Sequence, residues 1–416
     1  MINRYFWIIA LIGVWISTTP ATAQFVFSRS ASQEAGVLRY AEEGLFSSLT
    51  VSSSGEVKMS TDDRAIEKLS PGGFIQITHR NGLTTRDLKI TSDAEGHLYY
   101  EYGIQGFKYD FDDEGQSWLS GILPEIVEKT GLGAEGRISR ILKREGPEAA
   151  IRSLSKAATS YAILTYYKAI LNDSQCTPSV MERLLDRTSR EISSSSRLAE
   201  ALRWGAEKYP DEPKITVALV KAVHEISSSS AASGALRYLL EKRAPTKEAQ
   251  LEAFRVIQEI SSSSAQGEAL EEMSRRLTAD RTVYAQYCRT VGTISSSSVQ
   301  GQTLEALVTS SPLGNEMAWD EFFQAVEGIS SSSVQGSVLR QTAKSCPLDE
   351  ETVGMFLRAV NSISSSSQQG KSIRSLLERK DLSKNLLRDI SDFVENRISS
   401  SSVRRELQSL LAGRSR

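Results

Sequence analysis

Histidine and cysteine are scarce in this chain of 416 residues, with three of each. The histidines are His79, His97 and His224, and the cysteines are Cys176, Cys288 and Cys346. No histidines stand at H-E-x-x-H spacing, so zinc hydrolysis and histidine-based acid–base catalysis have no candidate residues. The cysteines form no C-x-x-C pair, which excludes a dense disulfide framework. Cys288 falls on an apolar helical position and is expected to be a buried small hydrophobic residue.

The chain also lacks an excess of charge of either sign. Lysine and arginine number 49, aspartate and glutamate 51, and the net charge is −2. This charge predicts no broad electrostatic footprint for nucleic acid or an anionic membrane, because binding to either usually requires a clear basic excess.

Only the N-terminus carries an apolar run, and it is short. Met1–Arg4 is basic, Tyr5–Ser17 is apolar, and Ala21-Thr22-Ala23 has the form of a signal-peptidase site. A membrane span needs about 20 apolar residues. We therefore expect residues 1–23 to be a cleaved signal peptide, with the protein periplasmic or secreted and without a membrane span; an uncleaved anchor is the alternative.

Three short motifs match chemical signatures only in part. Gly131–Gly136 matches G-x-G-x-x-G, but a helix is expected before it where a nucleotide-binding loop needs a strand. Ser153–Lys156 matches S-x-x-K without its partners in the required order. Asp110–Gly115 starts like a calcium loop whose twelfth position is Gly121 instead of glutamate. No catalytic, cofactor or metal residues are therefore predicted, and Asp110–Gly115 is expected to cap a helix.

Residues 24–112 have the pattern of a small antiparallel β domain. Apolar and polar residues alternate in short runs such as Phe74–Ile77, which predicts about five or six strands. Turn residues separate the runs, among them Asn81-Gly82, which suits a tight hairpin. From residue 113 the period becomes helical, and residues 113–150 are expected to form a helical bridge.

The dominant feature is the phrase Ile-Ser-Ser-Ser-Ser, which occurs seven times. Its isoleucines are Ile192, Ile226, Ile260, Ile294, Ile329, Ile363 and Ile398, at intervals of 34 or 35 residues. Such a period marks a stacked repeat. Ala157–Tyr161 lies 35 residues before the first isoleucine and is interpreted as a degenerate copy, giving about eight units.

Each period holds two amphipathic helices joined by a serine turn. Apolar residues recur three and six or seven positions before the isoleucine, and again ten positions after it. Neither helix can bury its stripe alone, so residues 151–416 are predicted to form an α-solenoid. The fold class is thus α+β.

Small residues recur seven positions after the isoleucine. They are Ala199, Ser233, Gly267, Gly301, Gly336 and Gly370. Glycine within a helix costs about 1 kcal/mol relative to alanine. Its recurrence predicts that the backbone of a neighbouring helix approaches there.

The four serines leave three interpretations open. The second or third, for example Ser194 or Ser195, is expected to cap the following helix. The capping motif is then simply duplicated with the repeat. Alternatively, the hydroxyls form a row that binds an extended polar ligand such as a glycan, or the serines are modified. The candidate interaction residues are the third serines, Ser195, Ser229, Ser263, Ser297, Ser332, Ser366 and Ser401.

The chain resembles a group of uncharacterised bacterial exported proteins that carry I-x-S-D-Y-type helical repeats of HEAT-like or tetratricopeptide-like shape after a small β domain. The matching segments are Leu69–Gly73, Gly115–Leu119, Leu123–Glu125 and Gly131–Ile141. Similar repeats are attached to antirepressor-type membrane metallopeptidases. Here Ser-Ser stands where the family has Asp-Tyr, and the peptidase motif is missing. The resemblance implies an envelope-located sensing or scaffolding module.

The function expected from the sequence is non-enzymatic. We expect a cell-envelope scaffold whose solenoid surface binds a protein partner. The alternatives are a glycan- or peptidoglycan-binding protein using the serine-lined edge, and an accessory or sensor subunit of an envelope enzyme. No cofactor is expected.

Overall fold

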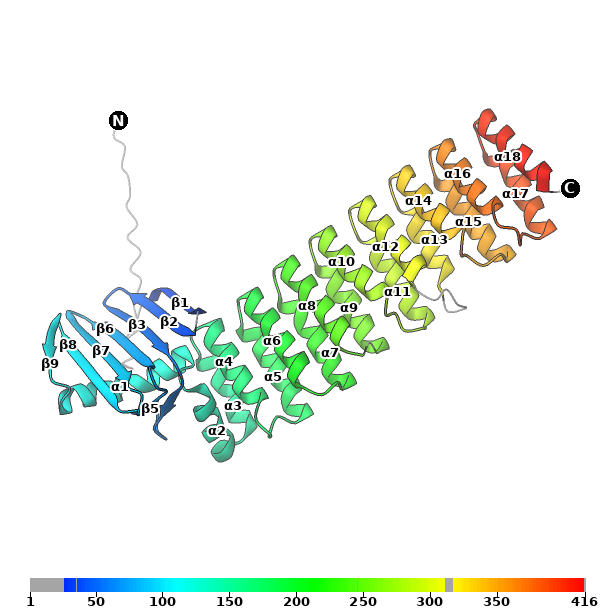
Figure 1. Cartoon of the computed structure of the whole chain (residues 1–416). Helices are drawn as coiled ribbons and strands as arrows, with labels where there is room; N and C mark the ends of the chain where they lie inside the picture. The colour runs from blue at the N-terminus through cyan, green and yellow to red at the C-terminus, as the bar shows by residue number, and fades with distance from the viewer. Residues whose placement is uncertain (1–25, 35, 245, 311–316, 415–416) are drawn as a thin grey trace, which may run out of the picture. The chain divides into compact units, whose positions relative to one another are not determined.

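The computed structural model describes residues 26–34, 36–244, 246–310 and 317–414 (Figure 1). The predicted signal peptide, residues 1–23, lies outside them. An antiparallel β domain precedes a solenoid-like helical array, as the α+β class predicts. Contacts divide the chain into two compact units, Met1–Glu56 with Lys68–Ser117, and Val57–Glu67 with Trp118–Arg416. The domain boundaries at residues 112 and 150 stay predictions.

The first unit is built around a seven-stranded antiparallel sheet in the order β1-β2-β3-β6-β7-β8-β9. Its strands are β1 (Val26–Glu34), β2 (Val37–Gly44), β3 (Ser47–Ser54), β6 (Phe74–Asn81), β7 (Thr84–Ser92), β8 (Leu98–Ile104) and β9 (Phe107–Tyr109). The short strands β4 (Val57–Met59) and β5 (Ile66–Leu69) pair separately.

Apolar residues alternate along the strands, so that they gather on one buried face of the sheet. Tyr40, Val51, Ile77, Leu88 and Tyr102 pair in register across β2, β3, β6, β7 and β8. All five are at most 4% exposed. Such cross-strand neighbours are the stabilising unit of a sheet.

The sheet has more strands than the five or six predicted. β1 and β2 were missing from that prediction because serine, arginine and glutamate fill much of their sequences and hide the apolar alternation. The predicted turns are confirmed, since Gly55, Gly72, Gly82 and Gly96 all adopt positive φ angles that favour glycine.

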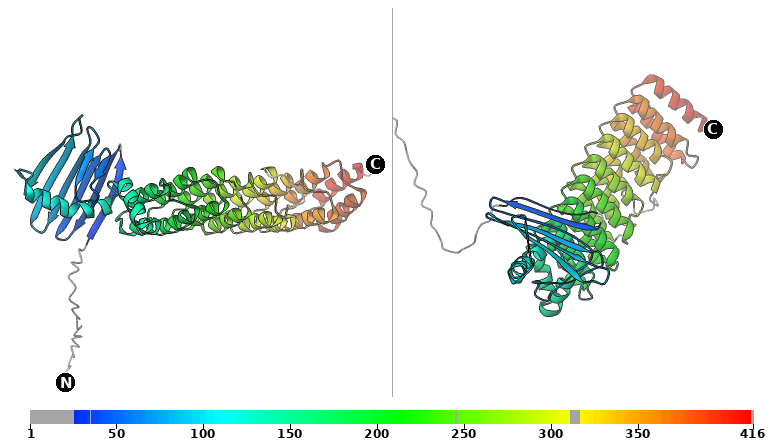
Figure 2. Two further views of the ribbon diagram at one scale, coloured as in Figure 1. Left: turned by 90° about the horizontal axis from the view of Figure 1, so that it is seen from below. Right: turned by 60° about the vertical axis from the view of Figure 1, so that its left-hand side comes forward.

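Eighteen α-helices lie in the described chain. The first three are α1 (Asp113–Thr130), α2 (Ala134–Glu145) and α3 (Pro147–Ser153). One layer of the array then contains α5 (Pro178–Glu191), α7 (Pro213–Ala222), α9 (Lys247–Glu259), α11 (Arg281–Gly292), α13 (Trp319–Glu327), α15 (Glu350–Ser362) and α17 (Lys384–Arg397). The other contains α4 (Ser160–Leu171), α6 (Ser195–Lys208), α8 (Ser229–Lys242), α10 (Ser263–Ser274), α12 (Ser297–Ser310), α14 (Ser332–Thr342), α16 (Ser366–Leu377) and α18 (Ser401–Arg414). Within each layer, helices of successive repeats pack side by side (Figure 2).

The predicted core of the repeat is confirmed. The seven isoleucines are 1–6% exposed and lie at or just after the end of the first helix. In five copies a valine or isoleucine stands three positions earlier, and in six a leucine or isoleucine stands ten positions later; all of these are at most 1% exposed. The isoleucine therefore fills the core between two layers of helices.

The prediction for the recurrent glycines is wrong in one respect, because a side chain approaches them instead of a backbone. A Cβ atom on Gly267, Gly301 or Gly370 would lie 2.3–2.5 Å from a valine Cγ1 of the next repeat. At Gly336 the nearest atom is Oε1 of Gln368, 2.8 Å away. In each case the approaching side chain stands at the same repeat position, five residues after the next isoleucine. The β-branched valine fills the space that glycine leaves.

The cysteines are free, with Cys176 half-buried and Cys288 and Cys346 buried. The prediction for Cys288 is confirmed. None of the described helices is both long and apolar enough to span a bilayer.

Candidate functional site

The serine row consists of Ser160 and the four serines of each repeat. The third serine of one copy faces the first serine of the next, with Ser195 Oγ 3.0 Å from Ser227 Oγ. The same contact recurs at 2.7–2.9 Å in the five following pairs, Ser229–Ser261, Ser263–Ser295, Ser297–Ser330, Ser332–Ser364 and Ser366–Ser399. The predicted hydroxyl row along the array is therefore present.

The degenerate first copy takes part in this row. Ser160 Oγ lies 3.3 Å from Ser193 Oγ and accepts a hydrogen bond from the Ser194 backbone N–H at 3.2 Å. Thr159 caps α4 by accepting from the Ala162 N–H. The degenerate copy at Ala157–Tyr161 therefore forms the same helix-capping turn and the same contact with the next repeat as the full copies.

The second serine is the N-cap residue of the following helix, and its hydroxyl accepts the capping hydrogen bond in five of the seven copies. Ser194, Ser228 and Ser262 each have extended backbone and accept from the backbone N–H three residues later, at 3.4–3.5 Å. The Ser194 hydroxyl also lies 3.1 Å from that of Ser196, the fourth serine. Capping and intra-turn contacts therefore occupy the second and fourth serines.

The third serines, which are the predicted interaction residues, mostly bond to the next repeat. Six of the third serines, Ser195 to Ser366, are half-buried, and their hydroxyls bond to the next repeat. Ser401 is exposed, and no hydrogen bond of its hydroxyl is found in the described chain. The row is thus largely self-satisfied, and its use for a ligand stays a prediction.

A larger hollow lies on the other layer of the array. We call it the α7 groove. It has a volume of about 770 Å³ and is lined by residues of α5, α7 and α9 with the 3₁₀ turn Val223–Glu225. Leu185, Pro213, Val217, Ala218 and Ala222 supply its apolar surface. A groove of this size with an apolar floor is typical of a binding site.

A departure from the repeat opens this groove. Ala218 stands eight positions before its isoleucine, where later copies carry the larger Glu252, Gln286, Glu321 and Met355. The small side chain leaves space above α7. The small residue at position 218 is visible in the sequence, but it stands out only when the copies are compared position by position.

The rim of the groove carries both signs of charge. Lys214 and Lys221 project from α7, and no ion pair of either is found in the described chain. Glu182 and Glu248, on the flanking helices, also lack an ion pair within the described residues. Unpaired rim charges are available to orient a charged partner.

His224 lies at one end of the groove, close to the serine row. Its Nε2 is 3.1 Å from Glu252 Oε1, and its Nδ1 is 2.6 Å from Glu259 Oε2. It also lines a smaller cavity of about 170 Å³, with Ser229 and Ser261 among the other lining residues. The His224 side chain therefore connects the copies of Ile226 and Ile260, and it borders both the α7 groove and the serine row.

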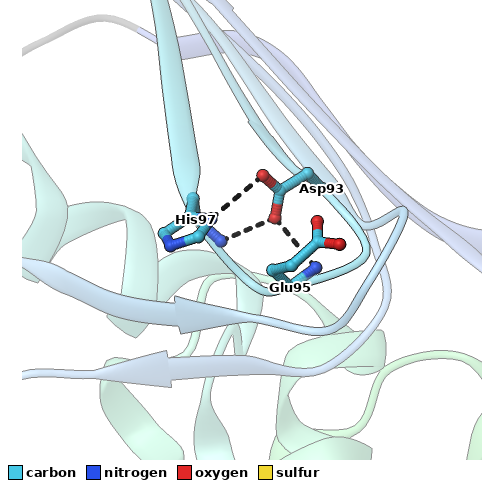
Figure 3. Close-up of side chains that lie close together, drawn as sticks. All are labelled: Asp93, Glu95 and His97. Atoms are coloured by element: carbon cyan, nitrogen blue, oxygen red, sulfur yellow. Dashed lines mark hydrogen bonds and ion pairs between the residues drawn. The ribbon is translucent and has the colours of Figure 1, made fainter.

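A second cluster that contains a histidine lies in a turn of the β sheet. Asp93, Glu95 and His97 lie together between β7 and β8 (Figure 3). Asp93 Oδ1 accepts from the backbone N–H groups of Glu95 and His97 at 3.0 and 2.8 Å, and Oδ2 contacts His97 Nδ1 and the Tyr99 hydroxyl. These bonds define a side-chain-stabilised turn. Similarly, Asp112 in the calcium-like segment accepts from the N–H groups of Glu114 and Gly115 and caps α1, as predicted.

No known protein family and no curated protein matches the sequence. Among solved structures, one match is described as "Lipid-protein interactions in lipovitellin" and is 12% identical, with a TM-score of 0.31. The match covers 94% of this chain and 49% of that chain. The chain thus spans about half the length of that protein. Function is therefore inferred from the geometry of this chain.

Proposed function

We propose that this protein is a non-enzymatic scaffold of the bacterial cell envelope that holds a segment of a partner protein in the α7 groove. The observation that supports the proposal is the groove itself, which has an apolar floor from α5 and α7 and unpaired charges on its rim. The envelope location rests on the N-terminal sequence and on the family resemblance.

A protein segment fits this groove by its chemistry. An interface needs a desolvated apolar centre with a polar rim. Val217 and Ala218 provide the centre, and Lys214, Lys221 and Glu248 belong to the rim. A partner segment with apolar residues on one face and acidic residues beside Lys214 and Lys221 would match both.

The serine row is a weaker candidate for the binding surface. A glycan ladder needs hydroxyls that are free to exchange their bonds with the ligand. The Ser195 and Ser229 hydroxyls already bond to the next repeat, so a ligand would have to compete with contacts between repeats. The geometry therefore favours the α7 groove.

The test is to fill the groove. Ala218→Glu places there the residue that α9 and α13 carry at the same repeat position, so we expect the helix to tolerate it. Gln286→Glu makes a similar change on α11, outside the groove, at a position that is also half-buried. Wild type and Gln286→Glu should capture the same stoichiometric protein from an envelope fraction of the source cells. Ala218→Glu should weaken capture by about tenfold or more, because the apolar centre carries most of the binding energy.

Calorimetric titration of the purified partner then gives the affinity of each variant. Equal affinity for wild type and Ala218→Glu would contradict the proposal. Retention on peptidoglycan that Ala218→Glu leaves intact, and that alanines at the third serines abolish, would favour the glycan alternative.

A further inference from the structure

Four large apolar side chains are exposed at one end of the β sheet. Leu45 and Phe46 lie between β2 and β3, Leu83 lies between β6 and β7, and Phe107 opens β9. Their exposed fractions are 55%, 70%, 94% and 70%. We call them the sheet-tip patch. They make up half of the large hydrophobic side chains exposed in the described chain.

Hydrogen bonds hold the three hairpin tips in a row. The Gly82 backbone N–H donates to the Phe46 carbonyl at 2.7 Å, and the Gln105 N–H donates to the Thr85 carbonyl at 2.9 Å. The Gln105 side-chain amide also donates to the Leu83 carbonyl. The apolar residues are therefore neighbours on a fixed surface. An apolar patch of this kind marks an interaction site more often than a chance exposure.

The chain enters the sheet at this same end. Val26, the first residue of β1, pairs with Gly44, the neighbour of Leu45. The apolar run Tyr5–Ser17 is separated from Val26 only by residues 18–25, which reach at most about 29 Å when fully extended. Whenever that run is in a bilayer, Val26 at this end of the sheet is held within this distance of it, and the hairpin tips that carry the patch lie along the same end of the sheet.

The side chains around the patch suit a membrane interface. Phe107 and Tyr109 are exposed on β9, and aromatic residues favour the interfacial layer of a bilayer. Lys108 and Arg80 lie beside the patch, and no ion pair of either is found in the described chain. Basic side chains at this position attract anionic headgroups.

We propose that this end of the sheet docks on a lipid bilayer, with the sheet-tip patch inserted to interfacial depth. The occupant is the bilayer surface. The exposed aromatic and basic side chains beside the patch favour it over a protein partner, as does the short connection to the apolar run before cleavage. This docking is independent of the α7 groove.

Vesicle flotation tests the proposal on Gln24–Arg416, the mature chain that the sequence predicts. The probes are phosphatidylcholine vesicles and the same vesicles with phosphatidylglycerol added. We expect the wild type to float with vesicles and Phe46→Ser/Leu83→Ser to lower the bound fraction by about tenfold or more. Leu410→Ser removes an exposed leucine of α18 and should bind as the wild type does.

Because Leu83 is 94% exposed, Leu83→Ser alone cannot disturb the core and serves as a second variant with intact folding. A smaller loss of binding is expected for it. The proposal is overturned if the wild type floats with neither kind of vesicle, or if the double variant floats as well as the wild type. Loss of a purified protein partner by the double variant, without vesicle binding by the wild type, overturns it in favour of a protein interface. Ala218→Glu should not change flotation, which separates this proposal from the groove.

Discussion

Ser195 Oγ lies 3.0 Å from Ser227 Oγ, one repeat further along the chain. The same oxygen accepts a hydrogen bond from the Ser228 backbone N–H at 3.2 Å. The Ser195 hydroxyl thus connects the serine turns of two adjacent repeats, and its contact with a serine hydroxyl of the next repeat recurs along the array. The four serines divide into a helix cap, its partner within the turn, and a pair that ties adjacent repeats together.

Replacing a third serine inside the array should therefore weaken the stacking of repeats. Ser263→Ala removes the 2.9 Å contact with Ser295, and we expect the free energy of unfolding to fall by about 0.5–1.5 kcal/mol. Urea denaturation measures the change. Ser401→Ala is the matched control because no hydrogen bond of the exposed Ser401 hydroxyl is found in the described chain, and it should leave stability unchanged. Equal losses in both variants would show that the contact between repeats is not the cause.

The cysteine thiols should react slowly in the native protein. Burial raises the pKa of Cys176 to about 11 and that of Cys346 to about 11, and burial raises the pKa of Cys288 as well. At pH 8 a thiol with a pKa of 11 is about 0.1% thiolate, the reactive form. Iodoacetamide at pH 8 should label all three residues rapidly in urea but not in buffer, with half-buried Cys176 the first to react. Rapid native labelling of Cys288 would contradict its burial.

Asp349 should make stability depend on acid pH. It caps α15, and hydrogen bonding from the Thr352 backbone N–H holds its pKa below the usual value. A depressed pKa stabilises the folded state above the unfolded pKa of about 3.9, and this contribution is lost as pH falls through the folded value. Asp349→Asn keeps a capping side chain but cannot titrate. The stability difference between wild type and variant, measured by urea denaturation between pH 5 and pH 3, should shift in favour of the variant as pH falls. Parallel curves would contradict this assignment.

Much of the array could be predicted because its signals repeat. Ile226 and Val223 belong to an apolar helical stripe that recurs at an interval of 34 or 35 residues. Each copy therefore strengthens the helix prediction for the others. The groove depends on a single departure, Ala218, whose effect appears only when α5, α7 and α9 pack together. β1 escaped the pattern because polar side chains fill most of its length, and in β2 the buried face continues from Leu38 and Tyr40 to a glutamate, Glu42. The sheet-tip patch depends on strand order, since Phe46 and Leu83 are neighbours only because β3 pairs with β6.

Size complementarity between Gly301 and Val334 gives the sharpest test of how the repeats stack. A Cβ at Gly301 would meet Val334 Cγ1 at 2.3 Å, so Gly301→Ala should destabilise the protein by about 1–3 kcal/mol through overpacking. Two earlier copies carry small residues at both positions, Ala199 with Ala231 and Ser233 with Ala265. Gly301→Ala/Val334→Ala therefore recreates a pairing that the chain already uses. It should be more stable than Gly301→Ala alone, whereas Val334→Ala alone should be destabilised by loss of packing. A double-mutant cycle by urea denaturation measures the coupling, and additive effects of the two substitutions would show that this contact does not set the spacing of the repeats.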